Sequence, residues 1–247
     1  MAEPLRADPR LHSLLRATTA AATGLVVGAG LTFLVAALLG TAISGLPTAI
    51  LIVITLVLTQ GVAFGGVALA YLSIRGLGRR FIPAAVPSVR DLVWVIVGYV
   101  LALGGAFLGL AIVVITGAPA AQNQLGEVAV ENPELLLFLV PFSFLLIGPG
   151  EELLFRGIVQ GTLREAFGPV AGVTIASAIF AAVHYLALTG GASARLTTVG
   201  VLFLPSLVFG AAYERTRNLV VPALIHGAYN ATLFLLVFFA LRFAPAG

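Results

Sequence analysis

Hydrophobic residues fall along this chain in long uninterrupted runs, separated by short stretches that are rich in Arg, Pro and Gly. A helix that crosses the hydrocarbon core of a bilayer needs about 20 apolar residues, whereas transmembrane strands alternate apolar and polar residues over about ten positions. The runs therefore predict an all-α fold, a polytopic transmembrane helical bundle of about seven spans. The predicted spans cover residues 20–43, 47–74, 92–116, 134–164, 169–188, 197–213 and 219–241.

The fourth predicted span is interrupted by Gly148–Pro149–Gly150. One kinked helix and two half-helices both remain open for this sequence. Two full crossings would move Arg215 and Arg217 to the side that is otherwise poor in Arg, so one kinked span is preferred. Irregular backbone at membrane depth is tolerated where it is buried in protein or lines a cavity.

The Arg residues indicate an orientation, because cytoplasmic loops carry the basic excess. With seven spans, one side receives ten Arg residues and the other receives two, which predicts a cytoplasmic N-terminus and a C-terminus outside. The expected location is the plasma membrane. The richer side holds Arg6, Arg10, Arg16, Arg75, Arg79, Arg80, Arg90, Arg164, Arg215 and Arg217, and the poorer side holds Arg195 and Arg242.

Composition agrees with a lipid-covered protein. Hydrophobic residues make up 60% of the chain and charged residues 9%, against about 25% charged residues in soluble domains. The chain has no Cys, which excludes disulfides, thiolate chemistry and Cys-type metal sites. The basic residues form no clustered face of the kind that binds nucleic acid. The first apolar run exceeds the roughly 7–15 residues of a signal-peptide core, so it is expected to stay as the first transmembrane helix.

Six polar residues lie inside the predicted spans. Each ionised group at the centre of a membrane helix costs about 2.5–3.5 kcal/mol, so such groups are functional candidates by default. The six are Glu151, Glu152, Arg156, His184, His226 and Asn230.

Their spacing indicates which side chains share a helix face. Glu152 and Arg156 are four residues apart and can pair, while Glu151 points about 100° away around the same helix. His226 and Asn230 are also four residues apart. Spans four, five and seven therefore each offer a polar face to one common cavity.

Residues of these types can together catalyse hydrolysis. A Glu beside a His can activate water for attack on a carbonyl, and a second His with an Asn amide can hold a developing oxyanion. One Glu and two His residues could instead hold Zn²⁺ with an open coordination position. The motif positions offer no Ser or Cys nucleophile, which disfavours a covalent acyl-enzyme.

Three motifs carry a specific resemblance. Residues 151–157, EELLFRG, look like the EExxxR motif of the CPBP family, which includes the CAAX proteases and bacteriocin-processing enzymes and is also called the Abi family. Residues 180–184, FAAVH, match its FxxxH motif, and residues 226–230, HGAYN, match its HxxxN motif. The resemblance covers about residues 134–241. It divides the chain into an N-terminal segment, 1–19, N-terminal transmembrane helices and loops, 20–133, and a catalytic transmembrane core, 134–247.

The resemblance implies an intramembrane endopeptidase. By analogy Glu151 acts as general base on water with the help of His184, while His226 and Asn230 hold the oxyanion. Glu152 and Arg156 would be an orienting pair. A divalent metal such as Zn²⁺ on Glu151, His184 and His226 and a metal-free glutamate mechanism are both consistent with the family. The implied partners are membrane lipid and a peptide or protein substrate, with prenylated C-termini as one class.

Two other functions use the same residues. A transporter or proton relay would employ the buried Glu and His groups, and a broken helix near residues 148–150 would suit it. A non-catalytic immunity or scaffold protein would keep the motifs without turnover.

Overall fold

The computed structural model describes residues 8–43 and 45–243; Arg6, the other residues of 1–7, residue 44 and residues 244–247 lie outside the described part. Within it the chain is helical and has no strand beyond one isolated bridge between Asn123 and Leu188, which confirms the all-α prediction. The α-helices are α1 (Pro9–Ile43), α2 (Thr48–Leu56), α3 (Gly65–Ile74), α4 (Val89–Thr116), α5 (Gln124–Glu131), α6 (Glu134–Phe142), α7 (Gly148–Glu152), α8 (Gly161–Val183), α9 (Ala192–Thr216) and α10 (Val220–Phe243).

Three π-helical stretches join consecutive α-helices into longer rods. They are Val57–Phe64 between α2 and α3, Ser143–Ile147 between α6 and α7, and Leu153–Gln160 between α7 and α8. Six of the resulting helices in the described residues are long and apolar enough to cross a membrane. The protein is therefore an integral, multi-pass membrane protein.

The longest of these helices accounts for two of the seven predicted spans. It runs over the 54 residues Glu134–Ala187, which at about 1.5 Å per residue far exceeds the roughly 30 Å of a bilayer core. The chain reverses inside it at Gly168, where φ is 79° and ψ is 176°, a conformation essentially reserved for glycine. A Cβ on Gly172 would lie 2.9 Å from the Cα of Arg164, so the two arms of the reversal are in contact.

Span four is one continuous helical segment through residues 148–150. Gly148 has φ −54° and ψ −57°, and π-helical turns lie on both sides of α7. The wider turn before Pro149 accommodates a ring that clashes with the carbonyl four residues earlier in a regular α-helix. The two-half-helix reading is therefore wrong, and the broken helix that would favour a transporter is absent here.

Two boundaries differ from the sequence-based prediction. The first helix begins at Pro9, so residues 9–19 of the predicted N-terminal segment are its opening turns. Ser13 and Ala17 are buried, and the Ser13 hydroxyl donates to the Thr162 carbonyl at 2.8 Å. The predicted loop 117–133 contains a short helix, α5, which Asn123 caps by accepting a hydrogen bond from the Leu125 amide. Neither segment has a long apolar run. Tertiary contacts order the start of α1, and the Asn123 cap orders α5.

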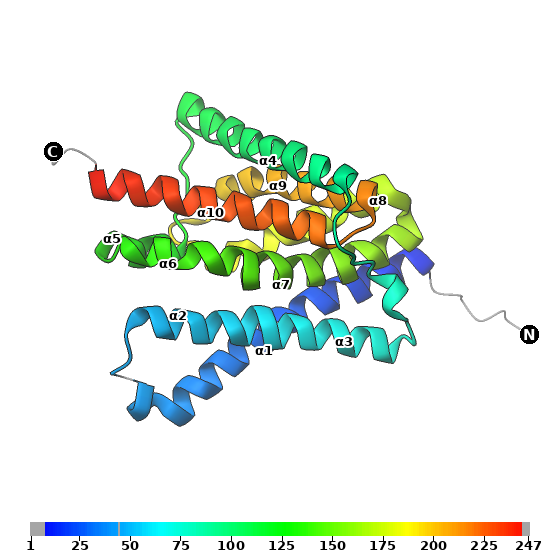
Figure 1. Cartoon of the computed structure of the whole chain (residues 1–247), viewed down its shortest axis with the longest axis horizontal. Coiled ribbons are helices and arrows are strands. Elements are labelled where there is room, and N and C mark those ends of the chain that lie inside the picture. Colours follow the sequence, from blue (N-terminus) through cyan, green and yellow to red (C-terminus); the bar gives the residue numbers. More distant parts are fainter. Residues whose placement is uncertain (1–7, 44, 244–247) are drawn as a thin grey trace, which may run out of the picture.

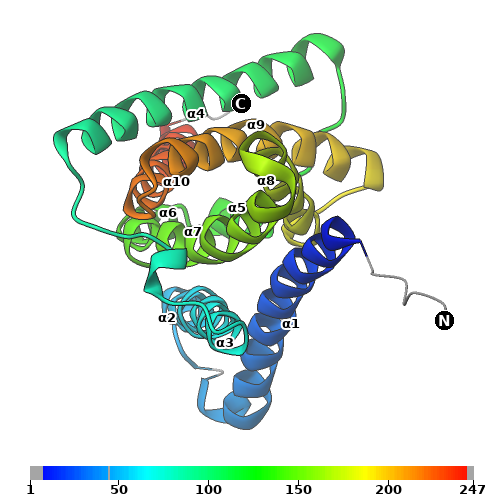
Figure 2. The same ribbon diagram turned by 90° about the vertical axis from the view of Figure 1, so that its right-hand side faces the viewer.

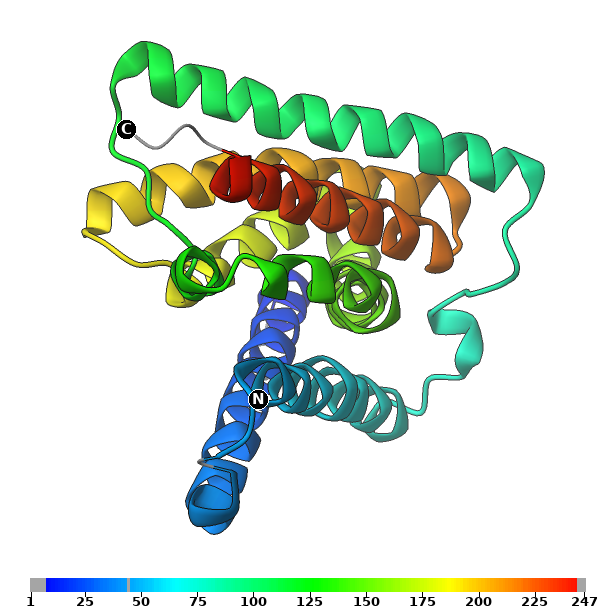
Figure 3. The same ribbon diagram turned by 60° about the vertical axis from the view of Figure 1, so that its left-hand side comes forward.

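The helices form three groups in space. Helices α6 to α10 make the central bundle, α4 packs on one side of it against α9 and α10, and α1 to α3 pack on the opposite side (Figures 2 and 3). The start of α1, the α3–α4 linker, the reversal in α8 and the α9–α10 turn lie at one end of the bundle (Figure 1). These are the Arg-rich segments, so the helices agree with the seven-span layout; which end faces the cytoplasm stays a prediction.

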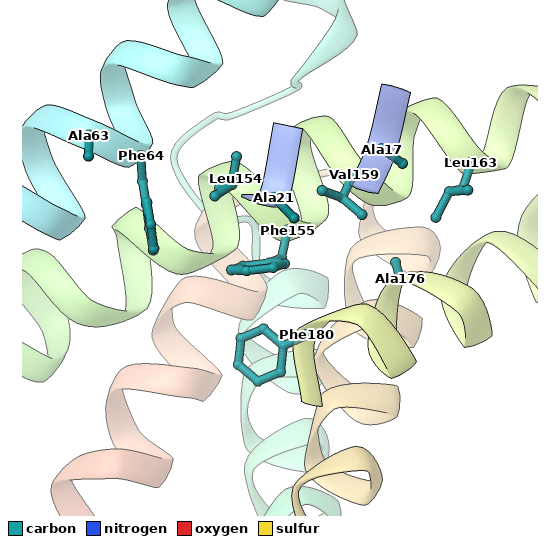
Figure 4. Packing of buried hydrophobic residues seen from close by; sticks show 10 residues of the cluster. All are labelled: Ala17, Ala21, Ala63, Phe64, Leu154, Phe155, Val159, Leu163, Ala176 and Phe180. Carbon is teal, nitrogen blue, oxygen red and sulfur yellow. The ribbon is translucent and has the colours of Figure 1, made fainter. Parts of the chain in front are cut away.

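Apolar packing joins the N-terminal helices to the bundle. One buried cluster links α1 and the Val57–Phe64 stretch to the chain on both sides of the reversal (Figure 4). Within it the Phe155 ring lies edge-on to Phe64, with centroids 6.1 Å apart, and edge-on to Phe180, with centroids 5.1 Å apart. Many outward-facing apolar side chains are exposed, for example Phe33 at 75% and Ile115 at 83%, as expected for a surface that faces lipid.

Candidate active site

Glu152 and Arg156 form an ion pair sealed inside the bundle. The Arg156 Nε atom donates to Oε2 of Glu152 at 3.0 Å, and both side chains are fully buried. The other guanidinium nitrogens donate to Ser206 Oγ at 2.9 Å and to Ser177 Oγ at 3.4 Å, and the Phe180 ring centroid lies 5.2 Å from the guanidinium carbon. Glu152 and Arg156 therefore pair as their four-residue spacing predicted, and serines of α8 and α9 accept the remaining hydrogen bonds of the guanidinium group.

The second oxygen of Glu152 orients His226. The Nδ1 atom of His226 lies 2.9 Å from Oε1 of Glu152, and because an ionised carboxylate only accepts, Nδ1 must carry the hydrogen. The Phe209 ring stacks on the imidazole with centroids 4.7 Å apart and planes 17° apart. These two contacts fix the ring so that Nε2 faces Glu151.

Glu151 faces both histidines. Its Oε2 atom lies 3.8 Å from Nε2 of His184 and 3.8 Å from Nε2 of His226. That oxygen is buried and has no hydrogen-bond partner among the described residues. The separations are too long for direct hydrogen bonds and fit one bridging water. The other oxygen, Oε1, accepts a 2.9 Å hydrogen bond from Nε2 of Gln60.

His184 directly follows the last residue of α8. Its Nδ1 atom lies 2.7 Å from the Phe180 carbonyl oxygen, and since a carbonyl only accepts, Nδ1 carries the hydrogen. A neutral His184 therefore presents the lone pair of Nε2 to Glu151. Its side chain is 23% exposed, against 12% for Glu151 and 0% for Glu152. The site opens to its surroundings on the His184 side.

Asn230 lies one turn beyond His226 on α10, as its spacing predicted. Its side chain is half-buried and forms no hydrogen bond with the other described residues. Its predicted part in oxyanion binding stays a prediction.

Two glycines of α7 allow neighbouring backbones to come close to the site. A Cβ on Gly148 would lie 2.6 Å from the Ala223 carbonyl oxygen of α10. A Cβ on Gly150 would lie 2.6 Å from the Gln60 carbonyl oxygen. The glycines of the Gly-Pro-Gly sequence thus serve close packing on both sides of the helix, where the sequence alone indicated a kink.

The arrangement can bind and activate a water molecule, because one carboxylate oxygen and two imidazole nitrogens point at a common position. A metal test gives a divided result. The donor types, and the Nδ1 hydrogen bonds of both histidines, are those of zinc-ligating residues. However, no three His, Cys, Asp or Glu side chains in residues 8–43 and 45–243 are arranged to hold a metal ion.

Sequence reasoning missed four residues that contact the predicted ones. Gln60 binds Glu151, Ser177 and Ser206 bind Arg156, and Phe209 stacks on His226. A single Gln inside an apolar span was a signal for Gln60, because an amide in a membrane helix needs a partner. The two serines and the phenylalanine are ordinary residues of membrane helices and gave no signal.

Comparison with known protein families identifies the second half of the chain. Residues 133–232 match the family described as Rce1-like, type II CAAX prenyl endopeptidase Rce1-like. The curated proteins contain no match to this chain, and neither do the solved structures.

Proposed function

Since residues 133–232 match the Rce1-like family of type II CAAX prenyl endopeptidases, we propose that this chain hydrolyses a peptide bond within the membrane by means of activated water. The observation that supports the proposal most is the position of Glu151. One of its carboxylate oxygens is buried without a hydrogen-bond partner in the described part of the chain and lies 3.8 Å from an imidazole nitrogen on each of two other spans. A water held there has an acceptor for its proton and two further polar neighbours.

In the proposed reaction Glu151 removes a proton from this water while the oxygen bonds to the substrate carbonyl carbon. The carbonyl oxygen takes the electron pair and becomes an oxyanion. Collapse of this tetrahedral intermediate breaks the C–N bond, and the proton held by Glu151 passes to the leaving nitrogen, with His184 assisting. The products are a carboxylic acid and an amine, so atoms and charge balance.

The remaining motif residues have supporting roles in this proposal. The Asn230 amide donates to the oxyanion, and His226, whose Nδ1 hydrogen is already donated to Glu152, donates through Nε2 in the form that is protonated on both ring nitrogens. Donors of this kind contribute about 10²–10³-fold each in other hydrolases. Glu152 and Arg156 touch no substrate and act as positioning residues, since Glu152 holds the His226 ring at 2.9 Å. If a divalent cation binds, Glu151, His184 and His226 are the residues that would hold it, and it would acidify the water.

The substrate class follows from the family. We propose a peptide or protein substrate with a prenylated C-terminus, whose lipid would partition into the bilayer beside the bare apolar helices. We place the protein in the plasma membrane, with its N-terminus in the cytoplasm because of the Arg distribution.

The test is cleavage of prenylated and unprenylated peptides by detergent-purified protein. Glu151→Gln keeps the size of the side chain and removes its basicity, so cleavage should fall by at least 10²-fold. Glu131→Gln is the matched control, because Glu131 is exposed at the end of α5. Equal turnover by wild type and Glu151→Gln would refute the mechanism, and lack of cleavage of every peptide by the wild type would refute the function.

A further inference from the structure

Gln60 lies on the second membrane span, in the π-helical stretch Val57–Phe64 and outside the segment that matches the family. Its Nε2 atom donates to Oε1 of Glu151 at 2.9 Å. This is the one hydrogen bond that the Glu151 side chain makes within the described residues. The N-terminal helices therefore contact the candidate base directly.

The contact is built into the packing. Gln60 is 8% exposed. Gly150 directly precedes Glu151, and the Gln60 backbone lies so close to it that a Cβ at position 150 would not fit. The two helices are thus in backbone contact where the hydrogen bond forms. The carbonyl oxygen of the Gln60 side chain is buried and has no hydrogen-bond partner within residues 8–43 and 45–243, a costly state for a polar atom. The side-chain NH₂ group of Gln60 donates to Glu151 although the side-chain oxygen of the same amide accepts no hydrogen bond from the described residues.

We propose that Gln60 is a positioning residue that fixes the Glu151 carboxylate, so that Oε2 faces the two histidines. This inference rests on the proposed function. With Oε1 held by the amide, Oε2 is the oxygen that faces the two histidines and the water between them. Without the amide, the Glu151 side chain can rotate and the water loses its place between the three groups.

The test compares kcat and KM for variants of Gln60 on a peptide that the wild type cleaves. Gln60→Met has a similar length and no donor, and Gln60→Asn keeps the amide but is too short to reach Glu151. Both should lower kcat by roughly 10–100-fold with little change in KM, because misplacement of a reacting group acts on the chemical step. Thr59→Val is the matched control, because Thr59 faces Gly28 of α1 and should keep full kcat.

The outcomes separate this inference from the proposed function. Full kcat in either Gln60 variant, a rise in KM alone, or an equal loss in Thr59→Val would overturn the role of Gln60 while cleavage by the wild type stands. A wild type that cleaves no peptide would overturn both. Thermal unfolding of each variant in detergent shows whether a loss of kcat comes from misfolding.

A separate observation concerns a groove of ≈ 440 Å³ between α1 and α3. Apolar residues such as Leu15 and Val67 line it together with Arg16 and Arg75, and the described lining residues include no Asp or Glu. Nη1 of Arg75 is buried without a hydrogen-bond partner in the described residues, and its guanidinium carbon lies 5.8 Å from the Tyr71 ring centroid. Two cations beside an apolar groove are complementary to an anion that carries a hydrocarbon chain.

We infer that this groove binds an anionic phospholipid, with the phosphate at Arg16 and Arg75 and an acyl chain along the apolar wall. The groove lies where α1 starts and α3 ends, at the Arg-rich end of the bundle (Figure 1). Basic pockets between membrane helices at such a surface bind anionic headgroups. The inference does not depend on the enzymatic activity.

The test is thermal unfolding of the purified chain with added phosphatidylglycerol or phosphatidylcholine of the same acyl chains. Phosphatidylglycerol should raise Tm more than phosphatidylcholine, and the double variant Arg16→Gln/Arg75→Gln should lose that difference. Arg242 is exposed near the C-terminal end of α10, at the other end of the bundle. Arg242→Gln should therefore keep the difference. Equal shifts from the two lipids, or a shift retained in the double variant, would overturn the inference; an equal shift with soluble glycerol phosphate would make a free phosphate the occupant and overturn it too.

Discussion

Arg156 offers the sharpest test of how the site is held together. Arg156→Met replaces a fully buried guanidinium with an apolar chain of similar length. The change leaves Glu152 buried with one remaining partner, the His226 Nδ1 atom at 2.9 Å. The hydroxyls of Ser206 and Ser177 also lose the donor that now lies at 2.9 Å and 3.4 Å.

The magnitude follows from the cost of an uncompensated buried charge. Removing one partner of a buried ion pair destabilises proteins by about 3–5 kcal/mol. In a chain of 247 residues, with roughly 2–4 °C of Tm per kcal/mol, Tm should fall by about 6–20 °C. Because Glu152 orients His226, cleavage should fall as well, even at temperatures where the variant is folded.

The assay is thermal unfolding in one detergent for four proteins: the wild type, Arg156→Met, Glu152→Gln and the double variant. The double variant leaves no buried charge at either position, so it should unfold above Arg156→Met. The difference between the double variant and the sum of the single ones gives the coupling energy of the pair. Arg156→Met with the Tm of the wild type would refute the reasoning. A double variant whose loss of stability equals the sum of the losses in Arg156→Met and Glu152→Gln would refute it as well.

Three further predictions come from packing and from the chemistry of the site. Gly109→Ala should destabilise the protein by about 1–3 kcal/mol, because its Cβ would lie 2.6 Å from Val201 of α9, whereas Gly104→Ala, with nothing within 4 Å, should be neutral in the same unfolding assay. Gly168→Ala should cost about 1–3 kcal/mol, because φ of 79° at the reversal disfavours any Cβ; an unchanged Tm would argue against a sharp reversal there. Cleavage that survives a strong chelator would support water activation by glutamate and histidine alone, and cleavage that chelator abolishes and zinc restores would require a bound metal.

Much of the architecture could be predicted from the sequence because its causes are local. The length of each apolar run decides whether a helix can cross the bilayer, and the four-residue spacing of Glu152 and Arg156 places both on one face of any helix. The predicted fifth span, 169–188, matches the arm after Gly168, where the Gly-Pro pair coincides with a positive φ at Gly168 and the chain reverses; the Gly148–Pro149 pair leaves its helix continuous. The roles of His184, His226 and Asn230 in catalysis stay predictions.

Other features depended on how the helices pack, which spacing along the chain does not determine. The sequence indicated that Glu151 and Glu152 point in different directions, but only the fold decided that both would meet His226, on different ring nitrogens. Likewise nothing local connects Gln60 with Glu151, 91 positions apart. Helix geometry is fixed by hydrogen bonds within one segment, whereas contacts between helices depend on which surfaces pack together and on where a small residue such as Gly150 lets two backbones meet.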